Sequence, residues 1–409
     1  MNPKIGDDEN DGLHEDRAFA TLFAINRLNL QPGDSVLLMR DCIFEKQFLQ
    51  IRSSGTECCP ITIGTYGEGN DPLIAADGQG IWYQDYGCEL DSPTHRYCGN
   101  ISSTIHLEDC SNITITNLEI INDKVGDEYY CATGVSAVAR NIEVMSNITL
   151  EDLFIHDVYG NIYDKHLNNG GIYFTCSKPS KNTFSRFENI LISKCFVYRT
   201  SRWGIAIGYT YAHENFKGTK YKEDAFKVYG HKNVRIENCY VKQAAGDAIT
   251  VMYSDNPIVN NNLSDEAACQ INDRYYLKPH NRGGKVGAGI WPWKCLNAEF
   301  RNNLARTTRL NQDGMAYDAD SGWSTLYEHN FSSLNEGGTV MFCLEEAIDS
   351  SFINNVIDDD LGGIFSMAKN PNGLIRDNVI NKKVATPLFR KRMDDGNVSM
   401  YNNIIREVK

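Results

Sequence analysis

Ser351-Phe-Ile-Asn-Asn-Val-Ile is one copy of a short motif that recurs, with substitutions, along most of this 409-residue chain. The copies in the C-terminal part begin 23 to 27 residues apart. A fixed period of this size is typical of a solenoid, in which each coil buries its apolar face only by stacking on its neighbours. Alternating Ile, Val and Phe with frequent Asn indicates short strands and turns rather than helices. Other copies begin at Asn112, Asn147, Asn189, Asn233, Ala298, Ser324, Leu374 and Val398.

The repeat predicts a single all-β domain over residues 1–409, with departures in four places. Residues 16–30 carry apolar positions at helical spacing and precede the turn Pro32-Gly33-Asp34. We therefore expect a short helix that caps the open end of the solenoid. Segments 122–146, 209–230 and 254–286 lack the regular period, and we interpret them as long loop insertions of the kind that form functional walls or lids.

Composition narrows the class of partner. The net charge of −13 argues against a general nucleic-acid binder, because such proteins present a basic face. No run of about 18 apolar residues occurs, so we expect no membrane span. The sequence leaves the oligomeric state open.

The helix before Pro32-Gly33-Asp34 and the Asn-rich coils resemble the entry and repeat of right-handed parallel β-helix proteins of the pectate-lyase-like superfamily. Gly55-Thr-Glu-Cys-Cys-Pro-Ile-Thr-Ile-Gly-Thr-Tyr-Gly-Glu resembles that group as well. The resemblance covers nearly the whole chain. It implies a right-handed parallel β-helix solenoid that acts on a carbohydrate. Members are mostly secreted, so it also implies a secreted or periplasmic protein whose leader has been removed before Asn2.

The resemblance does not supply catalytic residues. The Asn-Thr-Asp, Asp-Asp and Arg-Ile-Lys set of polygalacturonases is absent, and the calcium-and-arginine pattern of pectate lyases is not recognisable. The candidate site must therefore be read from the strand pattern of this chain.

Strand alternation assigns several carboxylates to one outer face of the solenoid. Tyr317 points inward, which sends Asp318 and Asp320 outward. Stacked strands lie roughly 4.8 Å apart, so carboxylates on one coil or on neighbouring coils can reach the separations that glycosidases use. Asp313 and Glu336 each precede a glycine at a coil corner, where acidic neighbours could raise a pKa enough to make an acid. We expect the catalytic pair among these four residues.

Aromatic and charged residues extend this face into a predicted substrate groove. Trp291 and Trp293 point outward from the preceding coil, where flat apolar rings can stack on sugars. Glu345 points outward from the following coil. The other predicted substrate-binding residues are Arg202, Trp203, Tyr209, Asp247 and Trp323.

The same residues have structural explanations. Asp318 and Asp320 could cap a turn, or could bind calcium through oxygen ligands. Asp313 and Glu336 could serve only turn chemistry, and each outward aromatic or basic residue could simply be surface. We expect no cofactor, with calcium as the alternative.

Three functions fit this pattern. The first is a glycoside hydrolase with a carboxylate pair. The second is a polysaccharide lyase, which removes a proton next to a uronate carboxyl and needs a base. The third is a non-catalytic carbohydrate-binding solenoid. Acids clustered beside tryptophans favour hydrolysis, because they would repel a uronate. The residues available to a lyase are Lys165, His166, Arg202, Tyr209, Lys278 and His280.

Overall fold

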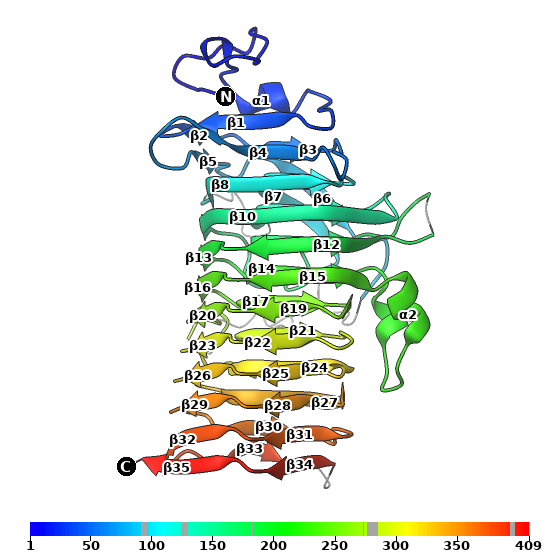
Figure 1. Ribbon diagram of the computed structural model, residues 1–409, viewed down its shortest axis with the longest axis vertical. Coiled ribbons are helices and arrows are strands. Elements are labelled where there is room, and N and C mark those ends of the chain that lie inside the picture. Colours follow the sequence, from blue (N-terminus) through cyan, green and yellow to red (C-terminus); the bar gives the residue numbers. More distant parts are fainter. Residues whose placement is uncertain are drawn as a thin grey trace.

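The computed structural model is a parallel β-helix whose coils stack along one long axis from the N-terminal to the C-terminal end (Figure 1). The structure describes residues 1–90, 96–123, 130–181, 183–272, 274–275, 285–392 and 397–408, except for the side chains of residues 344 and 345. Strands of successive coils pair in parallel on three faces. The predicted all-β parallel solenoid is therefore confirmed.

Strand pairing defines the three faces, and the long strands β8 and β10 belong to two of them. The first face contains β1 (Ser35–Met39), β4 (Ile61–Tyr66), β8 (Ile113–Asn122), β10 (Val144–Val158), β12 (Arg186–Ser193), β15 (His231–Glu237), β18 (Ser254–Asp255), β19 (Ile258–Asn260), β22 (Glu299–Arg301), β25 (Leu326–Glu328), β28 (Ser351–Ile353), β31 (Gly373–Arg376) and β34 (Val398–Tyr401). The second contains β2 (Ile43–Glu45), β5 (Leu73–Ala75), the ends of β8 and β10, β13 (Phe196–Thr200), β16 (Tyr240–Ala244), β20 (Leu263–Asp265), β23 (Leu304–Arg306), β26 (Phe331–Ser333), β29 (Val356–Asp358), β32 (Val379–Lys383) and β35 (Ile404–Val408). The third contains β3 (Leu49–Ile51), β7 (Cys98–Glu108), β9 (Cys131–Ala139), β11 (Gly170–Cys176), β14 (Trp203–Thr210), β17 (Ile249–Met252), β21 (Ile290–Trp293), β24 (Met315–Trp323), β27 (Gly338–Ile348), β30 (Phe365–Met367) and β33 (Phe389–Arg392), with β6 (Ile81–Asp85) antiparallel to β7.

Inward side chains of the third face stack in register to form the core. Ile249 pairs with Ile290, Ile290 with Tyr317, and Tyr317 with Val340. All four belong to the continuous buried core. This ladder confirms the predicted inward register, and it forces the residues between its members to face outward.

A ladder of buried asparagines ties the turns together. The Asn330 side-chain amide donates to the Phe300 carbonyl and to Asn355, while its oxygen accepts from the Asn303 backbone N–H at 2.8 Å and from the Asn303 side chain at 3.1 Å. The pattern repeats from coil to coil, so polar groups at these corners are satisfied without water. The ladder runs through Asn262, Asn303, Asn330, Asn355, Asn378 and Asn403.

The N-terminal cap contains less helix than predicted. Only Leu22–Ile25 (α1) is α-helical within residues 16–30, with a 3₁₀ turn at Glu15–Arg17. Asn26 ends α1 because its side chain donates to the Phe48 carbonyl and accepts from the Gln50 N–H. These bonds to the first coil replace further helical turns, and Leu22 still covers the core.

The structure describes the three predicted insertions differently, and residues 124–129, 273 and 276–284 within them lie outside the described residues. Segment 122–146 contains β9, which pairs with β7 and β11 and is an ordinary strand of the third face. Segment 254–286 begins with β18, β19 and β20, so its departure from the repeat starts only after Asp265. Segment 209–230 does leave the solenoid. It carries a 3₁₀ turn at His213–Phe216 and the helix α2 (Glu223–Val228), which projects beside the coils (Figure 1).

We expect Asn330→Ala to lower the free energy of unfolding by about 1–3 kcal/mol, because it leaves the Asn303 N–H buried without its partner and removes one hydrogen bond to the Phe300 carbonyl. Chemical denaturation followed by circular dichroism would measure the change. Asn381→Ala is the matched control, since that side chain donates one exposed hydrogen bond to Asp358. Equal midpoints for the two variants would contradict the role of the ladder.

Candidate active site

Three neighbouring strands of the third face carry the candidate site. In β24, Tyr317 and Ala319 belong to the core, and Asp318 and Asp320 alternate with them. Trp293 of β21 lies opposite Asp320 in register. The predicted outward placement of both aspartates is therefore what the structure shows.

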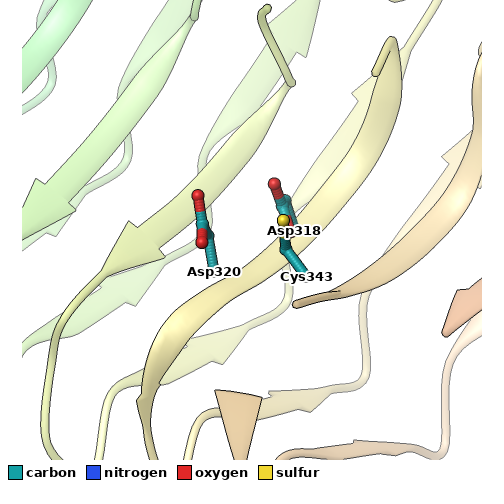
Figure 2. A group of neighbouring side chains, drawn as sticks. All are labelled: Asp318, Asp320 and Cys343. Carbon is teal, nitrogen blue, oxygen red and sulfur yellow. The ribbon is translucent and has the colours of Figure 1, made fainter. Parts of the chain in front are cut away.

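Asp318 and Asp320 lie close together beside Cys343 of β27. One ligand atom from each residue lies within 4.8 Å of the other two, and Figure 2 shows the three side chains side by side. Asp318 is only 4% exposed, and its Oδ1 has no hydrogen-bond partner among the described residues. Asp320 accepts a hydrogen bond of 2.9 Å from the Ser321 hydroxyl. The deeper carboxylate is thus the less stabilised one.

Burial and mutual repulsion raise the pKa values of these two carboxyl groups, so the pair retains one proton between them. Burial raises the pKa of Asp318 well above its usual value, and the charges of Asp320 and Asp313 raise it further. Burial also raises the pKa of Asp320, but Ser321, Lys165 and Lys294 favour its ionised form. Two like charges this close cannot both ionise easily. We therefore assign the shared proton to Asp318 and the negative charge to Asp320.

Asp313, at the corner before β24, belongs to the same charge cluster. Burial raises its pKa to about 6, helped by Asp320 and Asp247 and opposed by Lys165 and Arg390. Arg390 also holds the Asp313 backbone carbonyl. A carboxyl group with this pKa carries its proton in mildly acidic solution and can donate it.

Lys165 supplies positive charge to the whole cluster. It lies in the segment between β10 and β11, and its backbone carbonyl accepts a hydrogen bond of 3.1 Å from the Trp203 indole. Its charge lowers the pKa of Asp247, Asp313, Asp318 and Asp320. The sequence indicated Lys165 among the residues available to a lyase and not as a partner of the aspartates, so this role was missed.

Asp247 and Arg202 form a buried pair next to the aspartates. Their charged atoms lie 3.3 Å apart, and Asp247 Oδ1 accepts from the Ala288 N–H at 3.0 Å and from the Trp291 indole at 2.9 Å. Arg202 donates to the Val286 carbonyl. Nε and Nη1 of Arg202 have no hydrogen-bond partner among the described residues, and Oδ2 of Asp247 has only its ion pair with Arg202. Such orphaned groups, together with Asp318 Oδ1, indicate a place where a polar ligand or water binds.

Most of the predicted stacking aromatics are covered rather than open. Trp203 and Tyr209 are at most 1% exposed, and Trp291 and Trp323 are 5% exposed. They pack in an aromatic cluster with Phe226 of α2, because the 209–230 insertion folds over this end of the face. Among the predicted tryptophans, Trp293 alone is partly exposed. The prediction that Trp291 and Trp323 offer open faces to sugars therefore needs correction.

The comparisons with known proteins give the family. No family model matches the chain. The crystal structure of a GH136 lacto-N-biosidase from Eubacterium ramulus superposes with a TM-score of 0.96 at 50% identity, over 99% of this chain and 67% of that one. A lacto-N-biosidase from Bifidobacterium longum is 37% identical over 453 residues, covering 98% of this chain. The chain belongs to family GH136.

Membership of GH136 confirms the predicted kinship with carbohydrate-active parallel β-helix proteins, and both of these relatives are named lacto-N-biosidases. The chain spans 28% of the length of the B. longum relative. The described part of this GH136 chain has no helix that is long and apolar enough to cross a membrane.

Glu336 belongs to a different surface of the GH136 fold. Its carboxylate accepts from Arg309 at 3.0 Å and from the Leu310 N–H at 2.7 Å, so both oxygens are engaged. Glu336 therefore helps to wall a neighbouring pocket, and the geometry favours the aspartates over it as catalytic groups. The side chain of Glu345, and the residues Lys278 and His280, lie outside the described residues.

The donor set of this GH136 site fits calcium poorly. Asp318, Asp320 and Cys343 could each offer one ligand atom. Calcium takes roughly six to eight oxygen ligands, whereas this group includes a sulfur and feels the charges of Lys165 and Lys294.

We expect Lys165→Gln to raise the pKa of Asp313 above about 6, because the ammonium charge that opposes its protonation is lost. NMR titration of carbon-labelled Asp carboxyl groups would measure it. Lys194→Gln is the control, since Lys194 pairs with Glu151 at the turn between β12 and β13. An unchanged Asp313 titration in Lys165→Gln would show that Lys165 does not act on the cluster.

Proposed function

We propose that this chain hydrolyses the glycosidic bond of a lacto-N-bioside, the substrate class that gives its GH136 relatives their name. The observation that carries the proposal is the gathering of Asp313, Asp318 and Asp320 in one partly buried cluster, in which each carboxyl group has a different environment. Burial raises the pKa of Asp313 to about 6 and that of Asp318 well above its usual value, while Ser321, Lys165 and Lys294 oppose the effect of burial on Asp320 and favour its ionised form. A pair of carboxyl groups whose environments differ in this way supports an acid and a base in one site.

In the proposed reaction, Asp313 is the acid. It donates its proton to the glycosidic oxygen as the bond from that oxygen to the anomeric carbon breaks. The leaving sugar departs as an alcohol, so no negative charge has to build up on it. Arg390 fixes the Asp313 backbone and thereby the position of this carboxyl group.

Asp320 is the proposed base or nucleophile. Its negative charge stabilises the positive charge that develops on the sugar ring, and it either attacks the anomeric carbon or takes a proton from the attacking water. Water supplies the new hydroxyl group, which keeps one of the two protons of that water. The other proton returns to Asp313, directly or through Asp320, so both carboxyl groups regain their starting charge. Asp318 acts as a positioning residue, because its proton lets Asp320 remain charged at close range.

Carbohydrate binding is proposed to depend on Arg202, Asp247 and Trp293. The buried Arg202–Asp247 pair holds the Trp291 indole and the Ala288 backbone beside the site, and the partly exposed Trp293 ring can stack on a sugar. We also propose that the protein is secreted, because free oligosaccharides are encountered outside the cell.

We expect Asp313→Asn and Asp320→Asn each to lower kcat on an oligosaccharide by about 10²–10⁴-fold without unfolding the protein, because the amide can neither donate the proton nor carry the charge. On p-nitrophenyl lacto-N-bioside, whose leaving group needs little protonation, Asp313→Asn should lose much less than Asp320→Asn. Asp349→Asn, at an exposed turn, is the control. Near-normal rates for both active-site variants would contradict the assignment.

The pH profile tests the acid separately. We expect kcat/KM to fall as pH rises above about 6, because Asp313 loses the proton that it donates. Steady-state rates on an oligosaccharide across about pH 4 to 8 would show this decline, and in Lys165→Gln it should start at a higher pH. A rate that stays flat across this range would exclude Asp313 as the proton donor.

A further inference from the structure

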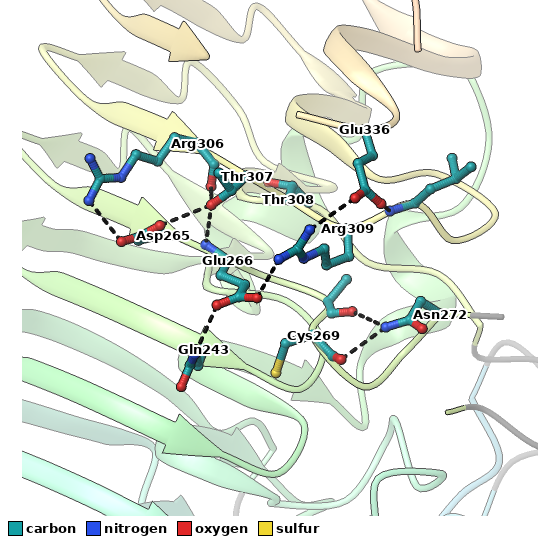
Figure 3. A network of polar contacts seen from close by, with 12 residues as sticks. Gln243, Asp265, Glu266, Cys269, Asn272, Arg306, Thr307, Thr308, Arg309 and Glu336 are labelled. Carbon is teal, nitrogen blue, oxygen red and sulfur yellow. Dashed lines mark hydrogen bonds and ion pairs between the residues drawn. The ribbon is translucent and has the colours of Figure 1, made fainter. Parts of the chain in front are cut away.

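A cavity lies at the corner between the second and third faces, outside the aspartate cluster. It has a volume of about 720 Å³, within the range of roughly 300–1,000 Å³ that small-ligand sites occupy. The ends of β20 and β23 and the turns that follow them form its walls (Figure 3). Residues that line this corner pocket include Glu266, Gln270, Arg274, Tyr275, Arg309 and Glu336.

The walls of this corner pocket are continuous with the walls of the candidate active site. Leu310, which lines the pocket, lies against Gly314, the residue after Asp313. Gly337, the residue after Glu336, lies directly against the Asp313 carbonyl. On the other side, the Ala268 N–H donates to the carbonyl of Gly246, next to Asp247. The backbone at Asp313 and Gly314 therefore borders both the aspartate cluster and this pocket.

A fixed polar network forms the floor of the pocket. Arg309 donates to Glu266 at 2.6 Å and to Glu336 at 3.0 Å, and Gln243 donates to Glu266 at 2.8 Å (Figure 3). Burial raises the pKa of Glu266, but its bonds from Arg309 and Gln243 outweigh burial and lower it overall, so Glu266 stays ionised. These bonds hold planar donors and acceptors in place before any ligand arrives.

The charges of the pocket cancel. Glu266 and Glu336 are matched by Arg309 and Arg274. Such a pocket gives no net attraction to a uronate, a sulfate or a basic group, whereas its paired donors and acceptors suit the hydroxyl groups of neutral sugars.

Open apolar and polar side chains complete the pocket. Tyr275 is 51% exposed, with the Arg274 guanidinium 5.9 Å from its ring centre. Leu310 is 44% exposed, and the side chain of Gln270 is exposed as well. An exposed aromatic ring beside an amide is a good surface for one sugar ring, because stacking and hydrogen bonding can act on it together.

We propose that the corner pocket binds neutral sugar units on the leaving-group side of the cleaved bond. The identity of the acid decides on which side of the cleaved bond the pocket lies. Asp313 protonates the leaving oxygen, and Asp313 is the aspartate whose backbone borders the pocket. The inference rests on the proposed function for this direction, while the binding of neutral sugars rests on the pocket alone.

Binding can be tested without turnover. In the Asp320→Asn background, we expect NMR titration with lactose or maltose to shift signals of the pocket residues, and Tyr275→Ala or Gln270→Ala to weaken that binding by roughly 3- to 10-fold. Tyr401→Ala is the control, since Tyr401 is also an exposed tyrosine, at 49%, but lies on β34 of the first face. Absence of binding, or equal binding by all variants, overturns the proposal.

Turnover then tests the direction. With an active enzyme, the two pocket variants should lower kcat/KM on a lacto-N-bioside that carries two or more further neutral sugars by roughly 3- to 10-fold. On p-nitrophenyl lacto-N-bioside, which has no such sugars, they should match the wild-type enzyme. Equal losses on both substrates overturn the leaving-group assignment. A wild-type chain that binds lactose in the pocket but cleaves neither substrate contradicts the proposed function and leaves the binding result standing.

Discussion

The parallel pairing of each coil with the next is the constraint on which the rest of the structure depends. Ile290, Tyr317 and Val340 stack in register inside the solenoid. The residues next to each of them in the same strand must therefore face outward. Asp318 and Asp320 face outward for this reason, and Trp293 meets Asp320 for the same reason. The core therefore positions the chemistry, since a slip of one residue would turn both carboxylates into the interior.

Register alone does not make an active site, and the segments that leave the coils supply the rest. The insertion with α2 covers Trp203, Trp291 and Trp323 and so lowers the polarity around the aspartates. Lys165 enters from the turn between β10 and β11 and restrains the pKa values that burial raises. The regular coils thus fix positions, while the irregular segments set the charge states.

The sequence could predict the parts of this arrangement that depend on local periodicity. The solenoid and the direction of Asp318 follow from alternation within single strands. The sequence pattern did not predict strand β9. All residues of Cys131–Ala139 are buried, so this stretch shows no alternation of apolar and polar residues and was interpreted as part of an insertion. The contact between Lys165 and the cluster, the covering of Trp291 and the pairing of Glu336 with Arg309 join segments far apart in the chain, and no local pattern encodes them. The asparagine ladder was visible only as frequent Asn, without its hydrogen bonds.

The buried aspartates also act on the fold that holds them. Asp313 has a pKa of about 6 in the folded chain, against about 4 for an unfolded chain. Its ionised form is therefore less stable in the folded state than in the unfolded state. Its contribution to stability is therefore most favourable below the unfolded pKa and is lost as pH rises toward 6. A shift of this size corresponds to roughly 3 kcal/mol above that pH. The packing of the stacked coils on either side must offset this free energy. The carboxyl group that keeps its proton for catalysis therefore lowers the stability of this part of the solenoid at higher pH.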